Sequence, residues 1–261
     1  MSTPLIKVSN LSKQYGDLLA VADVSFELPP RGSIGIVGES GSGKTTVAKI
    51  LVGLERATSG KIEVDGQDWS LPAKNSKERR ERAKYLQIVF QDPYSSLDPR
   101  QSIGSALREA LSISMKDSDE VIVRANELAD LVGLPQRILE LRPAKLSGGQ
   151  RQRAAIARAL ASNPKALILD ESVAALDVSI QAQILNLLVD IREQTGIAYI
   201  LVSHDLAVVR HFADSLIVMK NGIVVERGQT EVVMDQPEHE YTKLLLASVP
   251  CPGWIPGRRT V

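Results

Sequence analysis

The sequence predicts an α/β fold in which a helical segment separates two groups of strands. Short runs rich in β-branched residues, such as Ile34–Val37 and Ile197–Val202, lie toward the two ends of the chain. The first of these runs leads directly into a glycine-rich loop, and a helical pattern follows the loop. From Ile103 onward the pattern is also helical. Strands that alternate with helices in this way are typical of a mostly parallel sheet covered by helices.

The composition limits the classes of function. The chain has 261 residues, and its 31 Lys and Arg residues balance its 31 Asp and Glu residues. A chain of this size can bury a substantial core, and its neutral charge argues against a nucleic-acid partner. The single cysteine, Cys251, excludes an internal disulfide. Apolar runs stay shorter than the ~18 residues of a membrane span, and no signal peptide is evident, so we expect a cytosolic protein.

Local signals place the first elements. Thr46–Leu54 carries a helical pattern directly after the glycine-rich loop. Asp65-Gly66 and Asn221-Gly222 each lie between strand-like runs and predict β-hairpins, because these dipeptides tolerate positive φ angles. The basic run Lys74–Lys84 is interrupted by glutamates and has no stacking aromatics, so we expect a solvated helix or loop there.

The middle of the chain predicts a helical insertion. Ser118 is placed to cap a helix, with Asp119 and Glu120 in the favourable first turn and Gly133 at the end. Asn163-Pro164 stops a later helix before the next strand. The residues from Pro250 onward resemble a loosely ordered tail. We therefore expect a single domain over 1–261, with a core of residues 1–91 and 163–235, a helical subdomain at about 92–162, and a C-terminal helix and tail at 236–261.

The glycine-rich loop reads GESGSGKT and predicts a phosphate site. Its glycines let backbone amides turn toward phosphate oxygens, Lys44 offers a cation to the β and γ phosphates, and Thr45 offers a hydroxyl to Mg²⁺. A strand before the loop and a helix after it make this pattern specific. We assign nucleotide binding to Gly38, Glu39, Ser40, Gly41, Ser42, Gly43, Lys44, Thr45 and Thr46.

An acidic pair closes the apolar run ALILDE. The run places Asp170 at the end of a strand, where its carboxylate can hold the water shell of a metal ion. Glu171, beside it, can polarise an attacking water. A strand followed by two acids is weak on its own, but together with the phosphate loop it predicts a hydrolytic site for MgATP.

A second candidate phosphate-binding motif, LSGGQRQR, precedes an apolar helical pattern. Ser147 lies where a helix N-cap belongs, and Gly148 and Gly149 permit a phosphate to approach the exposed amides of the helix start. The simplest interpretation is a capped helix without a ligand. However, one ATP does not need both motifs from one molecule, so the pair of motifs favours a site shared between two chains.

These motifs resemble those of the ATP-binding subunits of ABC transporters, and the resemblance covers nearly the whole chain. GESGSGKT resembles the Walker A motif, ALILDE the Walker B motif and LSGGQ the family signature. Three shorter motifs complete the series of six in the family's order. Gln91 matches the Q-loop, Ala175-Leu176-Asp177 the D-loop and His204 the switch histidine. The resemblance implies a P-loop NTPase (RecA-like) core with an N-terminal antiparallel β subdomain and an inserted α-helical subdomain.

The resemblance also implies roles for single residues. Glu171 would be the general base, and Gln91 and His204 would sense the γ-phosphate and place the water, with Gln91 joining Thr45 and Asp170 around Mg²⁺. Tyr15 would stack on adenine, although a packed surface tyrosine is the alternative. Two such subunits would pair head to tail, so that each ATP also meets the partner's equivalents of the signature and D-loop residues, which in this chain are Ser147, Gly148, Gly149, Gln150 and Asp177.

Further segments resemble the ATPases of dipeptide, oligopeptide and nickel importers. They are FQDPYSSLDPR from Phe90, ALDVSIQAQILNLL from Ala175, and PEHEYTKLLLASVP near the C-terminus. Some longer relatives carry a cysteine cluster that Cys251 alone cannot build, so no iron–sulfur centre is expected. This resemblance favours import, with an ABC exporter or a soluble ABC ATPase as alternatives.

Two departures from the family pattern accompany this resemblance. After the acidic pair the chain reads Ser172, Val173, Ala174 where a proline first and a serine last are usual. Losing the proline frees a fixed φ angle directly after the proposed base, so we expect ATPase activity to survive at a reduced rate. Between His239 and Tyr241, Glu240 replaces another usual proline.

The resemblance implies the protein's partners. They would be a second ABC ATPase subunit, more often a different chain than a copy of this one in peptide importers, together with two transmembrane permease subunits and, indirectly, a solute-binding protein. The chain would then lie on the cytoplasmic face of a bacterial cell membrane as a peripheral subunit. The transported solute would be chosen by the permease and the binding protein.

Overall fold

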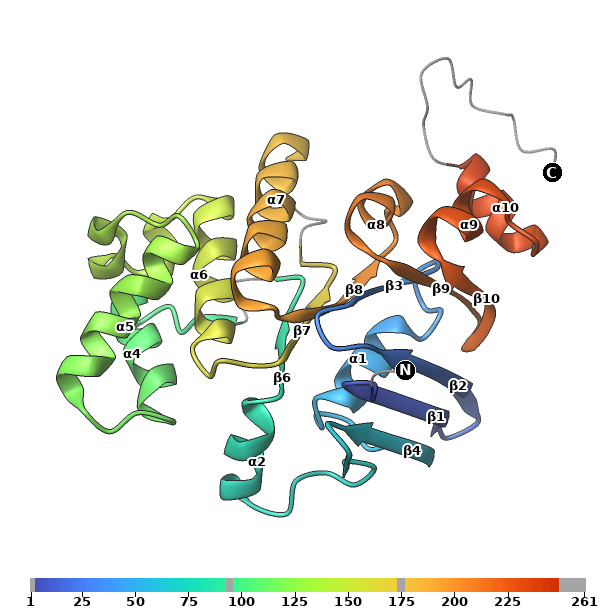
Figure 1. Ribbon diagram of the computed structural model, residues 1–261, viewed down its shortest axis with the longest axis horizontal. Helices are drawn as coiled ribbons and strands as arrows, with labels where there is room; N and C mark the ends of the chain where they lie inside the picture. Colours follow the sequence, from blue (N-terminus) through green and yellow to red (C-terminus); the bar gives the residue numbers. More distant parts are fainter. Residues whose placement is uncertain (1–2, 93–95, 173–176, 249–261) are drawn as a thin grey trace.

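The computed structural model describes residues 3–92, 96–172 and 177–248. Within these residues the chain forms a core sheet, a smaller N-terminal sheet and a layer of helices (Figure 1). The expected tail from Pro250 and Cys251 lie outside the described residues.

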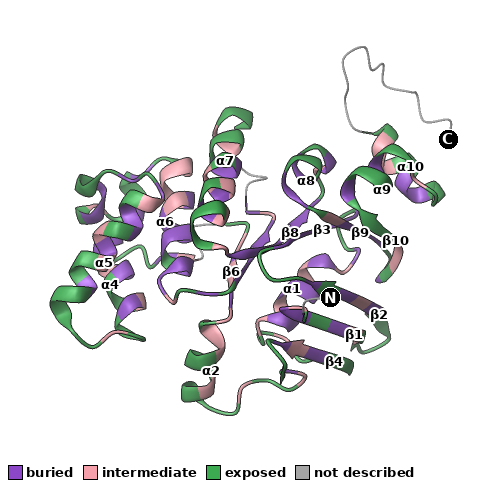
Figure 2. Cartoon of the chain, in the orientation of Figure 1, coloured by how far each residue is buried: buried purple, intermediate pink, exposed green. Residues whose placement is uncertain are grey.

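The core sheet is mostly parallel and carries the predicted site. Neighbouring strands pair in parallel except β10, which pairs antiparallel with β9. The four inner strands are rich in Val, Ile and Leu without polar alternation, as expected of a sheet covered on both faces, and Figure 2 colours them mainly as buried. The edge strand β10 has no buried residue. Across the sheet the order of the described strands is β10 (Ile223–Gln229), β9 (Ser215–Lys220), β3 (Ser33–Val37), β8 (Ala198–Ser203), β7 (Ala166–Asp170) and β6 (Leu86–Val89).

The two faces of this sheet belong to two different cores. Along β7, Ile168 packs into one core, whereas Leu167 and Leu169 pack into the other. The first core contains the N-terminal sheet and helix α1 (Lys44–Leu51), and the second contains the helical subdomain. Successive side chains of a strand point to opposite faces of the sheet. The core sheet therefore contributes side chains to both cores and separates them as a layer.

The N-terminal sheet is antiparallel, and its strand order is β2-β1-β4-β5. Its long strands β1 and β2 pair with several register shifts, and Asn10 and Asp23 adopt positive φ angles of 51° and 55°. These bulges increase the local twist of the strands. The strand bounds are β1 (Ile6–Tyr15), β2 (Leu18–Leu28), β4 (Ser59–Val64) and β5 (Gln67–Asp68).

The helical subdomain lies on the far side of the core sheet from this N-terminal sheet (Figure 1). One prediction about it is wrong: Asp117, not Ser118, caps α5, because its carboxylate accepts from the amides of Asp119 and Glu120. Aspartate is a strong N-cap acceptor, and Ser118 becomes the first helical residue. The subdomain contains α4 (Ile103–Ser112), α5 (Ser118–Leu131), the short 3₁₀ turns η1 (Gln136–Glu140) and η2 (Pro143–Lys145), and α6 (Gly148–Leu160).

The remaining helices connect or flank the sheets. The basic run forms α2, which has no buried residue and is capped by Asn75, in agreement with a solvated helix. Helix α7 packs beside α6 and ends at Gly196, whose φ of 71° suits a helix C-terminus. Their bounds are α2 (Ser76–Ala83), α7 (Val178–Thr195), α8 (Leu206–Phe212), α9 (Thr230–Asp235) and α10 (Glu240–Ala247).

Candidate nucleotide-binding and hydrolysis site

The phosphate loop joins β3 to α1 and depends on two glycines. Gly38 and Gly43 have φ angles of 153° and 101°, a range that other residues rarely adopt. A Cβ atom at Gly38 would lie 2.2 Å from the carbonyl oxygen of Met219, and one at Gly43 would lie 2.4 Å from that of Ala20. The loop is therefore pressed between β2 and the end of β9.

The turn between β9 and β10 supports the same loop through its backbone. The amide of Gly222 donates to the carbonyl of Ser42 at 3.1 Å, and the carbonyl of Gly222 accepts from Ala22 at 2.8 Å. Asn221 and Gly222 have φ angles of 48° and 83°, which this tight turn requires. Sequence reasoning placed the hairpin but gave no signal that its turn contacts the phosphate loop.

The side chain of Lys44 folds back onto the start of the phosphate loop. Its Nζ atom donates to the carbonyl oxygens of Gly38 and Glu39, both at 2.8 Å. Burial lowers the pKa of this ammonium, while the charges of Glu171 and Asp170 oppose the shift. A buried cation whose hydrogen-bond acceptors are neutral oxygens gains from an anionic partner. Lys44 therefore fits the phosphate role that the motif predicts.

The start of α1 offers a second feature for phosphate. Gly43 occupies the N-cap position, and no side chain among the described residues caps the helix. The first-turn amides and the helix dipole therefore favour an anion at this end. Around the loop, Ser42 is buried, Gly43, Thr45 and Thr46 are half-buried, and Glu39, Ser40 and Gly41 are exposed.

Thr45 and Asp170 form the pair expected for Mg²⁺. The Thr45 hydroxyl donates to Oδ1 of Asp170 at 3.0 Å. Asp170 is buried at the end of β7, and burial raises the pKa of its carboxyl, which the bond from Thr45 opposes. A hydroxyl and a carboxylate are oxygen donors of the kind that Mg²⁺ prefers.

Glu171 and His204 lie side by side next to this pair. The Nδ1 atom of His204 lies 3.5 Å from Oε1 of Glu171. Glu171 follows β7 and His204 follows β8, and because these strands are parallel neighbours their carboxyl ends meet at one edge. Gln91, which is exposed, follows β6 at the same edge. Such edges are where ligands bind in open α/β sheets.

The backbone of Glu171 is strained. Its φ angle is 48°, a left-handed conformation that costs about 1–2 kcal/mol for a residue with a Cβ atom. Its amide donates to the carbonyl of Val202 at 2.9 Å, which fixes the strained residue to β8. Ser172, the first residue after the acidic pair, is buried, and its hydroxyl has no hydrogen-bond partner among the described residues. Val173 and Ala174 lie outside the described residues.

The signature motif starts α6, in the helical subdomain. Ser147 is the N-cap: its hydroxyl accepts from the amide of Gln150 at 3.3 Å, and the Gln150 side chain accepts from the amide of Ser147 at 3.0 Å. Ser147 is exposed, and Gly148 and Gly149 are half-buried. A Cβ atom at Gly149 would lie 2.7 Å from the side chain of Ile180 in α7. This glycine therefore allows α6 to approach α7 closely.

Two other expected residues belong to other elements, Tyr15 to β1 and Asp177 to the start of α7. Tyr15 ends β1 with 42% of its surface exposed, and the Nζ atom of Lys13 lies 4.4 Å from the centre of its ring. Asp177 is exposed directly before α7, whereas Ala175 and Leu176 lie outside the described residues. Tyr15 has the exposed ring that stacking on a base requires.

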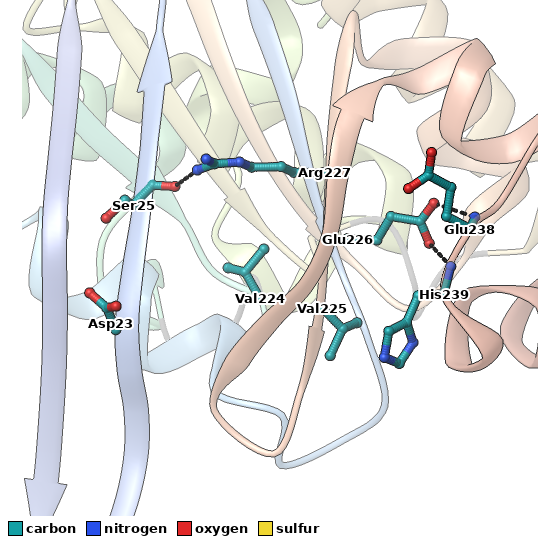
Figure 3. Close-up of a pocket in the computed structure, with 8 residues that line it drawn as sticks. All are labelled: Asp23, Ser25, Val224, Val225, Glu226, Arg227, Glu238 and His239. Atoms are coloured by element: carbon teal, nitrogen blue, oxygen red, sulfur yellow. Dashed lines mark hydrogen bonds between the residues drawn. The ribbon is translucent and has the colours of Figure 1, made fainter.

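A pocket of about 680 Å³ lies away from all of these residues. Figure 3 shows it between β2 and β10, lined by Ser25, Glu226, Arg227 and His239 among others. Arg227 donates to the carbonyl of Ser25 at 3.0 Å, and the carboxylate of Glu226 accepts from the amides of Glu238 and His239. These groups bind one another, so we assign the pocket no ligand.

Residues 21–174 match a family model described as ABC transporter. The chain is 46% identical to the oligopeptide transport ATP-binding protein OppF of Lactococcus lactis, over 90% of this chain and 73% of the relative. It is 40% identical to the dipeptide transport ATP-binding protein DppF of Haemophilus influenzae, over 95% and 79%. It is 48% identical to the oligopeptide transport ATP-binding protein OppD of Mycobacterium tuberculosis, over 95% of this chain but 40% of that longer relative.

Solved structures resemble the fold. CbiO1 of Clostridium perfringens, part of the ABC transporter complex cbiONQ, aligns with a TM-score of 0.81 and 29% identity over 89% of this chain and 91% of that one. MJ0796, described as a dimeric post-hydrolysis state bound to ADP and Pi, aligns with a TM-score of 0.77 and 29% identity over 86% and 98%. No helix among the described residues combines the length and apolar character that crossing a bilayer requires.

Proposed function

Because the chain belongs to the ABC transporter family, we propose that it is the ATP-binding and ATP-hydrolysing subunit of an importer for peptides or similar small solutes. One observation carries the proposal: Lys44, Thr45, Asp170, Glu171 and His204 meet at one edge of the core sheet. The names of the relatives support peptides as the solute class.

The residues at this edge divide the work of binding. Lys44 and the first-turn amides of α1 would hold the phosphates. Thr45 and Asp170, whose oxygens lie 3.0 Å apart, would hold Mg²⁺ together with Gln91. MgATP, when bound, supplies the phosphoryl group and a cation that neutralises the charge developing on it. The ring of Tyr15 presents a face for the adenine.

Glu171 and His204 are placed to act on water. The carboxylate of Glu171 can accept a proton from a water aligned with the γ-phosphate. His204, whose Nδ1 atom lies 3.5 Å from that carboxylate, can orient both the water and the phosphate oxygens. The strained backbone of Glu171, fixed through its amide to β8, limits the directions in which its side chain points.

The signature residues serve a partner's nucleotide. Ser147 is exposed at the start of α6, in the subdomain on the opposite face of the core sheet from α1 (Figure 1). We propose that two ATPase subunits pair head to tail, so that Ser147, Gly149 and Asp177 of this chain complete the partner's site. The dimeric assembly of MJ0796 supports this pairing.

We propose that a small pocket beside β6 marks the surface that meets a permease. It has a volume of about 120 Å³ and is lined by residues of β6 and the helical subdomain, including Ile88, Ile113 and Arg158. Ile113 is 51% exposed beside it. Because β6 leads directly to Gln91, a permease's cytoplasmic helix bound here would be coupled to the γ-phosphate. This contact would hold the chain on the cytoplasmic face of the membrane.

Reconstitution tests the proposal. The chain is co-expressed with the permease genes beside its own, purified in mild detergent and placed in vesicles with a labelled oligopeptide and its binding protein. We expect co-purification and ATP-dependent peptide uptake that requires the binding protein. Failure to associate with any permease would contradict the transport role. ATP-driven expulsion of the peptide would show that the protein serves an exporter and not an importer.

A further inference from the structure

The C-terminal helix α10 contacts the phosphate loop through a single buried hydroxyl. The amide of Glu39, the second residue of the loop, donates to the hydroxyl oxygen of Tyr241 at 3.1 Å. Tyr241 is only 4% exposed. None of the motifs in the site described above includes this tyrosine.

The contact leads directly to the phosphate-binding lysine. The carbonyl of Glu39 accepts from Nζ of Lys44 at 2.8 Å and also from the amide of Ser42 at 3.2 Å. One residue of the loop is therefore held on its amide side by Tyr241 and on its carbonyl side by Lys44. A rotation of Glu39 would move one of the two carbonyl acceptors, those of Gly38 and Glu39, that hold the Lys44 ammonium at 2.8 Å.

Several contacts position Tyr241 and the start of α10. The Nζ atom of Lys220, at the end of β9, lies 4.7 Å from the centre of the ring. At the start of α10 the Nδ1 atom of His239 accepts from the amide of Tyr241 at 3.0 Å. Glu226 of β10 accepts from the amides of Glu238 and His239 at 2.8 and 3.1 Å, as Figure 3 shows. The core sheet thus holds the start of α10, which carries Tyr241.

We propose that Tyr241 is a positioning residue for ATP binding, acting through Glu39 to hold the phosphate loop and Lys44 in their binding conformation. The proposal rests on ATP occupying this loop. A loop that is already ordered loses less conformational freedom on binding, so Tyr241 should strengthen ATP binding without taking part in hydrolysis. Displacement of α10 would weaken ATP binding in the same way.

The test replaces the hydroxyl and keeps the ring. Tyr241→Phe removes the acceptor for Glu39, and Tyr199→Phe is the matched control. Tyr199 is fully buried, and its hydroxyl donates to the carbonyl of Leu188 at 3.1 Å, outside the phosphate loop. Both variants remove one buried hydroxyl that bonds to a backbone group, so both should lose a similar amount of stability. Binding of a fluorescent ATP analogue with Mg²⁺ is titrated for each purified full-length chain.

We expect Tyr241→Phe to bind the analogue about three- to tenfold more weakly, the range that loss of one hydrogen bond gives. Tyr199→Phe should bind as the wild type does. In the assembled transporter, Tyr241→Phe should raise KM for ATP and leave kcat unchanged. Hydrogen–deuterium exchange of the Glu39 amide is followed by NMR without nucleotide. The exchange should be faster than in the wild type for Tyr241→Phe, and unchanged for Tyr199→Phe.

Several results would overturn the inference. Unchanged analogue binding by Tyr241→Phe would do so, as would an equal loss of binding in Tyr199→Phe. A fall in kcat at constant KM would place Tyr241 in the hydrolysis step instead. If the wild-type chain itself bound no ATP analogue, the proposed function would fail, and the inference would fail with it.

Discussion

The Thr45 hydroxyl donates a 3.0 Å hydrogen bond to the carboxylate of Asp170, a residue 125 positions later in the chain. The bond joins the start of α1 to the end of β7. It is a contact between two of the groups expected to hold Mg²⁺. The bond aligns the two halves of the predicted site, which come from distant parts of the sequence.

Asp170 should destabilise the chain in the absence of nucleotide. Burial raises the pKa of its carboxyl, so the ionised form is disfavoured in the folded state. The part of the stability that depends on Asp170 is then greatest at low pH and is lost as the pH rises through its folded pKa. Asp170→Asn should raise the unfolding midpoint at pH 7 by roughly 2 °C or more, about 1 kcal/mol in a domain of this size, while removing Mg²⁺-dependent hydrolysis.

Thermal unfolding of the wild type and of Asp170→Asn is measured from pH 4 to pH 8. Asp190→Asn, which lies outside the predicted site, is the control for loss of a negative charge. The midpoint difference between wild type and Asp170→Asn should shrink as the pH falls. A lower midpoint for Asp170→Asn at pH 7 would contradict the assignment of a costly buried charge.

Glu171→Gln should reduce ATP hydrolysis in the assembled transporter by at least about 100-fold, because the amide cannot accept the proton of the attacking water. ATP binding should persist, since we assign the holding of the phosphates to Lys44 and the first-turn amides of α1, and not to Glu171. Phosphate release and analogue binding are measured on the same preparation. A wild-type rate equal to that of Glu171→Gln would remove Glu171 from the role of general base.

Ser147→Arg should leave this chain's own ATP binding intact and abolish hydrolysis at the partner's site. The bulky cation fills the position where a partner's phosphate would meet the start of α6. Ser102→Arg is the matched control, because Ser102 also caps a helix of the same subdomain, accepting from the amide of Ser105 at 3.2 Å. Loss of ATP binding by the isolated, folded Ser147→Arg chain would show that the residue serves its own site.

Tyr15→Ala should weaken ATP binding by about fivefold or more, since stacking on a base contributes about 1–3 kcal/mol. Tyr15→Phe should bind normally, because the ring alone stacks. Leu18→Ala controls for loss of an exposed apolar side chain on the adjacent strand, where Leu18 is 66% exposed. Equal binding by Tyr15→Ala and Tyr15→Phe would favour a packed surface tyrosine over an adenine contact.

Local sequence signals predicted most of the core. The strand, phosphate loop and α1 follow one another as expected, although α1 begins at Lys44 and not at Thr46. The Asp65-Gly66 and Asn221-Gly222 hairpins form between β4 and β5 and between β9 and β10. Each of these features depends on residues close together in the chain, where dihedral preferences and periodicity act directly.

Long-range contacts could not be predicted in this way. Tyr241 and Glu39 lie 202 positions apart, and no pattern in either segment indicates that they meet. The long strands β1 and β2 were not placed either, because bulges at Asn10 and Asp23 break their alternation. The cap at Asp117 was missed because its neighbour Ser118 is an equally suitable residue type.

The position of β3 in the core sheet determines which segments must be synthesised before the phosphate loop is fully supported. Its neighbours are β8 and β9, and the turn at Gly222 and the ring of Tyr241 complete the support of its loop. All four come from the last third of the sequence, so a ribosome releases them well after Lys44. Lys44 therefore leaves the ribosome before the strands, the turn and the tyrosine that support its loop, and we expect the loop to become ordered only after those later segments have been synthesised.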